Sequence, residues 1–237
     1  MTTRISAKRI SAILLAGALL SATGFTSAHA ADRYINVSAT GSVKVTPDTV
    51  RINTTVTNVG ATSATAQSTV ATTASALRKA LASNGVVTQY IKSANLTIYP
   101  EYNYTADKGS VLVGYRASQT FEIIVRNAKN AGTVVDAIVA AAGENMTLDG
   151  VTPYVFDNTT ATNAARTDAV TRAKAKAAHY AKLLGVTLSS VTSLDETTAP
   201  SPYPIMMATA KMDSGATQID LGQQDVSVSV TVRWSIK

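Results

Sequence analysis

The chain has 237 residues with 21 basic and 15 acidic side chains, a formal charge of +6 and no cysteine. The lack of cysteine excludes disulfides, thiol catalysis, iron–sulfur clusters and lipid attachment through cysteine. Charged residues make up 15% of the chain, below the ~25% of ordinary soluble domains, and this low-charge composition suits an exported protein.

The first thirty residues have the pattern of a secretory signal peptide. A basic stretch precedes an apolar core over Ile10–Leu20, and a small-residue segment then ends in Ala28-His29-Ala30. This order predicts a Sec-type leader that is cleaved after Ala30. The expected location is the periplasm, with outer-membrane association or secretion as alternatives.

The leader carries much of the positive charge. Without residues 1–30 the formal charge falls to +3, because Arg4, Lys8 and Arg9 leave with them. A chain so close to neutral lacks the basic footprint of a nucleic-acid-binding protein. We therefore expect no nucleic-acid partner.

Two strands and a helix are predicted at the start of the mature chain. Apolar and polar side chains alternate over Tyr34–Val45, which Gly41 interrupts, and again over Val50–Thr57. The period then changes to that of a helix, which begins near Ala61. The helix ends at Asn84-Gly85, because glycine readily adopts the left-handed conformation of a helix end.

A hairpin and a second helix follow. Strands are predicted over Ile91–Tyr99 and Leu112–Arg126, with Asp107-Lys108-Gly109 between them as the turn. Apolar side chains at helical spacing predict a helix over Ala128–Ala142, which Gly143 ends.

The last third contains a strand over Leu148–Phe156, the longest helix up to Leu184, a short strand over Val191–Leu194 and a clear strand over Val226–Ile236. The segment Thr198–Gln218 is rich in proline and methionine and has no period, so it is predicted to be a long loop. The predicted apolar face of the longest helix consists of Val170, Ala173, Ala177, Tyr180 and Leu184.

This order, β-β-α-β-β-α-β-α-β-β, predicts an α+β fold. Each helix has a single apolar stripe, which suits helices packed on one face of antiparallel sheet. We expect one domain over residues 31–237 that contains the proline- and methionine-rich loop at 198–218.

The sequence contains no nucleophile elbow, phosphate-binding loop or zinc-protease signature. His179 is the single histidine after the leader, and its alanine- and lysine-rich surroundings predict a solvated helix residue. One histidine without cysteine makes a zinc site improbable. We therefore expect no catalytic residue, no cofactor and no metal.

Two groups of acids are the remaining chemical candidates. Glu101 lies among Tyr99, Tyr102 and Tyr104, where it is either an acid in an aromatic site or part of a tyrosine-covered strand end. The pair Asp195-Glu196 either binds a hard cation or belongs to a solvated loop, and the solvated interpretation is the more ordinary one.

The longest helix is locally basic. Asp168, Arg172, Lys176 and His179 follow one stripe, which is either a surface for anionic partners or a solvated face. In the second interpretation an Asp168–Arg172 pair contributes a few tenths of a kcal/mol. Arg172 and Lys176 are the candidates for a basic surface.

Four stretches together resemble the SIMPL-domain family of bacterial exported proteins, which includes YggE-like proteins and the periplasmic or outer-membrane immunogenic proteins. They are Ile35–Gly41 with Val45–Asp48, Ile91–Tyr104, Ala165–Gly185 and Val226–Ile236. The resemblance implies location in the periplasm or at the outer membrane, ring-like oligomers in some members, a loose link to oxidative-stress tolerance, and no established catalytic residues.

Three functional hypotheses follow. The first is a non-enzymatic envelope protein that forms a homo-oligomer through edge strands, with Met206 and Met207 in a contact arm. The second is a binding module for a small apolar or lipidic ligand, held between helices and sheet near Tyr99, Tyr102, Tyr104 and Tyr115. The third is a hydrolase built on Glu101 or on Asp195 and Glu196.

Overall fold

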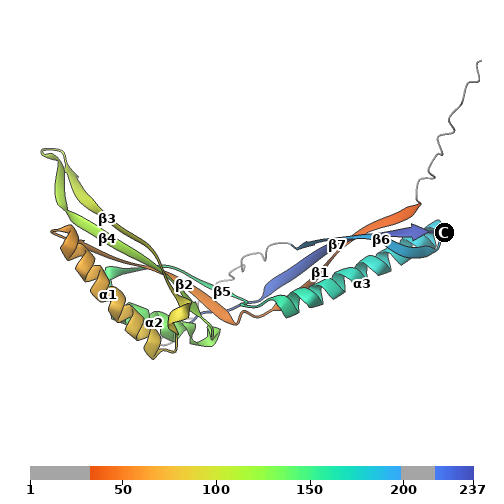
Figure 1. Ribbon diagram of the computed structural model, residues 1–237, viewed down its shortest axis with the longest axis horizontal. Helices are drawn as coiled ribbons and strands as arrows, with labels where there is room; N and C mark the ends of the chain where they lie inside the picture. The colour runs from red at the N-terminus through yellow and green to blue at the C-terminus, as the bar shows by residue number, and fades with distance from the viewer. Residues whose placement is uncertain (1–32, 199–216) are drawn as a thin grey trace, which may run out of the picture. The chain divides into compact units, whose positions relative to one another are not determined.

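The computed structural model describes residues 33–198 and 217–237 and confirms the α+β class and the element order (Figure 1). The strands are β1 Tyr34–Val45, β2 Thr49–Gly60, β3 Ile91–Thr105, β4 Gly109–Val125, β5 Met146–Tyr154, β6 Leu188–Thr198 and β7 Gln224–Ile236. The helices are α1 Ser63–Ser83, α2 Ala131–Ala142 and α3 Thr159–Leu184, with short 3-10 turns η1 Thr88–Tyr90, η2 Ala128–Asn130 and η3 Gly143–Asn145.

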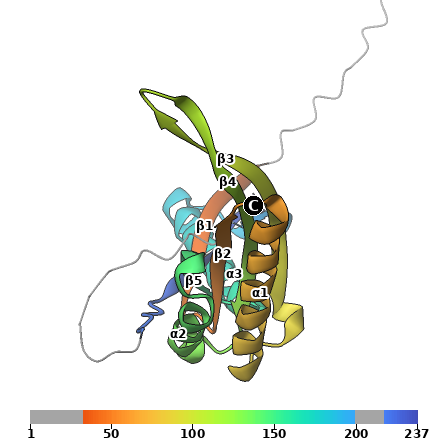
Figure 2. The same ribbon diagram turned by 90° about the vertical axis from the view of Figure 1, so that its left-hand side faces the viewer.

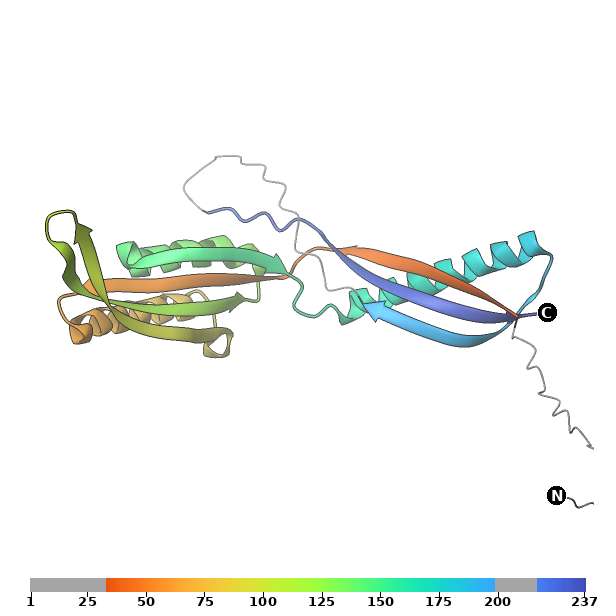
Figure 3. The ribbon, with the colours of Figure 1, turned by 90° about the horizontal axis from the view of Figure 1, so that it is seen from above.

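The described strands form two antiparallel sheets. One has the order β3-β4-β2-β5 and carries α1 and α2 on one face (Figure 2). The other has the order β1-β7-β6, and α3 runs along it (Figure 3). Helices on one face of each sheet were the sequence-based expectation, and the structure confirms it.

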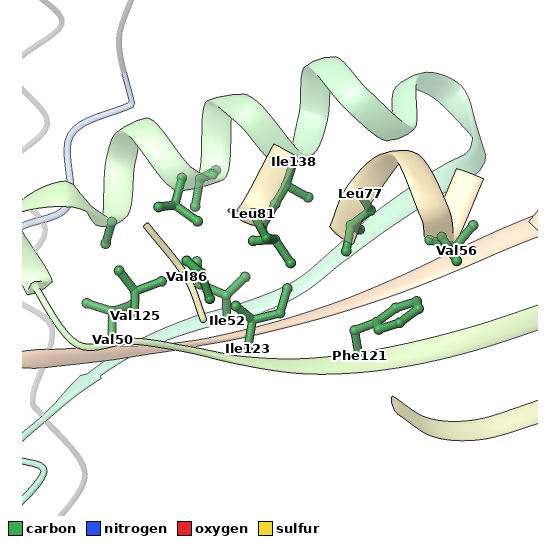
Figure 4. Close-up of a cluster of buried hydrophobic side chains, with 14 of the residues drawn as sticks. Val50, Ile52, Val56, Leu77, Leu81, Val86, Phe121, Ile123, Val125 and Ile138 are labelled. Atoms are coloured by element: carbon green, nitrogen blue, oxygen red, sulfur yellow. The ribbon is translucent and has the colours of Figure 1, made fainter. Parts of the chain in front are cut away.

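The core of the four-stranded sheet follows from strand alternation. Every second residue of β2 and β4 points at the helices, and the stripes of α1 and α2 meet them (Figure 4). The largest fully buried side chains include Phe121, Ile52, Leu77, Ile123 and Ile138. Each contributes about 2 kcal/mol to folding. These side chains pack together between the helices and the sheet, where an apolar ligand was expected from the sequence.

The buried face of α3 differs from the expectation. The residues that face the sheet are alanines at a four-residue spacing: Ala161, Ala165, Ala169, Ala173, Ala177 and Ala181. Val170, Tyr180 and Leu184, expected to be buried, are 37%, 43% and 66% exposed. The physical reason is a close approach of helix and strand, since a Cβ on Gly41 of β1 would lie 2.2 Å from the Ala165 carbonyl oxygen.

Strand lengths are the second difference. β6 covers Leu188–Thr198 instead of Val191–Leu194, because pairing with β7 extends the strand over residues that have no apolar alternation. Thr198 therefore ends a strand and does not begin the loop. Residues 199–216 of the expected loop and the expected leader lie outside the described residues, and residues 217–223 are neither helix nor strand.

Asp48, in the turn between β1 and β2, is an anchor for two other segments. Its carboxylate accepts hydrogen bonds from the Phe156 amide at 3.0 Å and the Thr49 hydroxyl at 2.8 Å, and its carbonyl accepts one from the Ala128 amide at 2.9 Å. Desolvation opposes ionisation, but these hydrogen bonds and the charge of Arg126 outweigh it and hold the pKa of Asp48 below its ordinary 3.8.

Replacing Asp48 with asparagine is expected to lower stability at neutral pH but not in acid. Because the folded state favours the ionised carboxylate, its contribution is present above pH 3.8 and is lost as the pH falls through the lower folded pKa. Urea unfolding of the parent protein and Asp48→Asn at pH 7, 5 and 3 measures this. A stability gap that stays constant over the three pH values would contradict the assignment.

Candidate functional site

Glu101 and Arg116 form an ion pair on the helix-free face of the four-stranded sheet. The register of β3 and β4 pairs Tyr99 with Arg116 and Glu101 with Gly114, so these residues share one face. The hydrogen bond from Arg116 to Glu101 holds the pKa of the guanidinium above its ordinary value. Oε2 of Glu101 is buried and has no hydrogen-bond partner in the described part of the chain.

The structure thus brings Tyr99 and Glu101 together with a residue that the sequence patterns missed. Arg116 lies within the predicted strand Leu112–Arg126 and was not a candidate site residue. Its pairing with Glu101 depends on the register of the β3–β4 hairpin, which shifts twice along its length. No local spacing in the sequence encodes those shifts.

Tyr102 and Tyr104 lie farther along the same hairpin, toward its turn. Tyr99, Tyr102 and Tyr104 are 48%, 56% and 78% exposed. On β4 the side chains of Val111, Leu112 and Val113 are exposed as well. Figure 2 shows why, since the β3–β4 hairpin extends past the first turn of α1, so its tip is not covered by that helix. We call residues 102–113 the hairpin end.

A pocket of about 330 Å³ lies beside Arg116, away from the hairpin end. Its walls come from β2, β4, η3 and β5, and its lining consists of Thr57, Asn58, Val59, Arg116, Glu144, Asn145, Met146 and Thr147. The Asn58 side-chain amide donates a hydrogen bond to Oδ1 of Asn145 at 3.2 Å. None of these residues was a candidate in the sequence, because the pocket forms only when three strands and a 3-10 turn meet.

The basic stripe of α3 is largely paired. Arg172 donates to Asp168 at 2.9 Å, the i,i+4 pair expected from the sequence, and this bond holds the pKa of Asp168 below its ordinary value. Lys176 donates to the carbonyl of Ser38 on β1 at 3.3 Å. The first contact lies within α3 and the second ties α3 to its own sheet, and both favour the interpretation of a structural, solvated face.

The two adjacent acids are not brought together. Asp195 and Glu196 are consecutive residues of β6, so their side chains point to opposite faces of the sheet. Glu196 accepts two hydrogen bonds from Arg166 of α3, at 2.7 and 2.8 Å. The expectation of a loop is wrong here, and with it the shared cation site.

Residues 33–198 and 217–237 contain no cluster of three or more acidic or histidine side chains that could hold a metal ion. Over the same ranges no helix has the length and apolar character needed to span a membrane. Met206 and Met207 lie outside the described residues.

Comparison with known proteins identifies the family. The family model SIMPL, described as a protein of unknown function (DUF541), matches residues 35–234. The uncharacterized protein YggE of Edwardsiella ictaluri (strain 93-146) is 31% identical over 164 residues, which cover 68% of this chain. The chain spans 66% of the length of that relative. The match over nearly all of the two-sheet body shows that the chain belongs to the SIMPL family.

Proposed function

We propose that this protein is an exported, non-enzymatic component of the cell envelope that self-associates into a homo-oligomer. The observation that carries the proposal is the hairpin end, where large apolar side chains of β3 and β4 face solvent together. Large apolar side chains that gather on an exposed segment commonly mark an interaction site.

The position of β3 in its sheet supports a second copy as the partner. β3 is an edge strand of the order β3-β4-β2-β5, so it carries backbone donors and acceptors without a strand partner on one side. Pro100 removes a donor and so protects the middle of the strand. The segment Tyr102-Asn103-Tyr104 has neither proline nor charge. It combines an open strand edge with large exposed side chains, which suits pairing with the same segment of another copy.

Replacing Tyr102 and Leu112 together by serine is expected to dissociate the oligomer. These residues are paired across the hairpin, and truncating buried aromatic or leucine contacts costs about 2 kcal/mol each, so the dissociation constant of the double variant rises roughly 1,000-fold. Native mass spectrometry and light scattering over a concentration series measure the change.

The matched control is Leu183→Ser with Leu184→Ser, because these side chains are 67% and 66% exposed but lie on α3. That variant should retain the oligomer. The proposal would be contradicted by a parent protein that is strictly monomeric at high concentration. It would also be contradicted by a control that dissociates as readily as the hairpin variant.

A binding module for an apolar or lipidic ligand is the second candidate. The hairpin end favours it because tyrosine, valine and leucine side chains suit a lipid surface as well as a protein surface. Its location would be the exposed hairpin and not the filled helix–sheet space. Sedimentation of the monomeric parent with phospholipid vesicles, lost on replacing Tyr102 and Leu112, would support lipid binding over self-association.

The non-enzymatic part of the proposal rests on the placement of the acids. Glu101 is engaged by Arg116, and Asp195 and Glu196 lie on opposite faces of β6, so the third hypothesis, a carboxylate hydrolase, has no pair of acids to use. Export rests on the leader pattern in residues 1–30. The link to oxidative-stress tolerance rests on family resemblance, and Met206 and Met207 are the oxidisable side chains it would involve.

A further inference from the structure

We propose that the pocket beside Arg116 binds a neutral saccharide. We call it the Asn58–Asn145 pocket, after the two amides that meet across it at 3.2 Å. None of its lining residues belongs to the hairpin end, so this inference does not rest on the proposed self-association. The charge, hydrogen-bonding groups and size of the pocket each point to the ligand class.

Charge argues against an anionic ligand. Arg116 is the single cation in the lining, and its guanidinium is already paired with the carboxylate of Glu101. Glu144 adds a carboxylate to the wall of the pocket. A phosphate or carboxylate ligand would therefore meet a cation that is already paired and an acid that forms no ion pair within residues 33–198 and 217–237, which disfavours it.

The hydrogen-bonding groups suit a compound with several hydroxyls. Each asparagine amide carries two donors and two acceptor positions, and the Asn58–Asn145 bond uses one donor and one acceptor position of the pair. Thr57 and Thr147 add hydroxyls, and Glu144 adds acceptor oxygens. A sugar hydroxyl donates one hydrogen bond and accepts others, so a polyol can satisfy this mixed set as water does.

The remaining lining residues are apolar and suit the C–H groups of a sugar ring. Val59 is exposed, and Met146 lies beside it at the start of β5. Such side chains pack against the C–H face of a pyranose ring. The volume of about 330 Å³ lies at the small end of the ~300–1,000 Å³ range of ligand pockets, which suits a mono- or disaccharide.

Isothermal titration calorimetry and ligand-observed NMR with three neutral disaccharides, N,N′-diacetylchitobiose, maltose and cellobiose, test the inference. We expect at least one to bind with a Kd in the millimolar range or below. Asn145→Ala and Glu144→Gln should each weaken that binding roughly tenfold, the effect of losing one hydrogen bond. Glu144 is exposed and Asn145 is half-buried in the short η3 turn, and circular dichroism verifies that both variants fold.

Asn103→Ala, on the hairpin end, is the matched control and should bind like the parent. Inorganic phosphate serves as the anionic probe. Absence of binding to all three sugars, binding of phosphate in place of sugar, or sugar binding that Asn145→Ala and Glu144→Gln leave unchanged would each overturn the inference. Loss of sugar binding with the oligomer intact separates this site from the hairpin end.

Discussion

Replacing Phe121 with alanine is expected to lower the free energy of unfolding by about 4 kcal/mol. Phe121 is fully buried in the middle of β4, where it packs with Ile52 and Leu77, and the Arg78 guanidinium lies 5.0 Å from its ring centroid. Truncation removes the transfer free energy of the ring and leaves a cavity between a sheet and a helix. Because both elements are held by their own hydrogen bonds, neither can collapse into that cavity.

Urea unfolding followed by circular dichroism measures the loss. Tyr180→Ala is the matched control, since it removes an aromatic ring from a surface position of α3 and should change stability by about 0.5 kcal/mol or less. The comparison also tests the corrected face of α3. Equal losses in the two variants would contradict the structure, in which the ring of Phe121 is buried and the ring of Tyr180 is exposed.

The elements of this fold were predictable where one local rule decides the outcome. The last strand alternates without a break, and the structure buries Val226, Val228, Val230 and Val232 on one face. The end of α1 was equally readable, because Gly85 has a φ of +79° that side chains disfavour. The fold class and the order of the elements follow from such segments, because a helix with a single apolar stripe buries that stripe against another element, here a sheet.

Prediction failed where packing distance decides the outcome. The stripe of α3 was assigned to Val170, Ala173, Ala177, Tyr180 and Leu184, and the structure buries only the two alanines of that set. The sheet accepts only methyl-sized side chains there, and this constraint comes from Gly41, more than a hundred residues away in the chain. Alanine contributes little hydrophobic burial, so a hydropathy pattern gives it little weight.

The candidate site was even less accessible to sequence. The partner of Glu101 is fixed by hairpin register, and the Asn58–Asn145 pocket by the meeting of separate elements. Asp195 and Glu196 were expected in a loop, but pairing with β7 places both in β6. Because neighbours in a strand face opposite sides of the sheet, the two carboxylates are separated. Each of these relations is a long-range pairing, which composition and periodicity do not contain.

Replacing Gly41 with alanine is expected to destabilise the protein by about 3 kcal/mol. A Cβ at this position would lie 2.2 Å from the Ala165 carbonyl oxygen and 2.3 Å from the Ala169 amide nitrogen. Both are backbone atoms of α3, so no side chain can rotate away and the helix itself must move off β1. Alanine lowers chain entropy in the unfolded state and so gains about 0.5–1 kcal/mol elsewhere, but the displaced helix outweighs that gain.

Gly150→Ala is the matched control for Gly41→Ala. Gly150 also lies in a strand, but no atom stands within 4 Å of its would-be Cβ and its φ is not positive. The control should therefore be neutral or slightly stabilising in the same urea titration. If Gly41→Ala were as stable as Gly150→Ala, the close contact between the backbones of α3 and β1 would be contradicted. The alanine stripe would then have to be explained by helix propensity alone, because nothing else in the packing demands methyl-sized side chains.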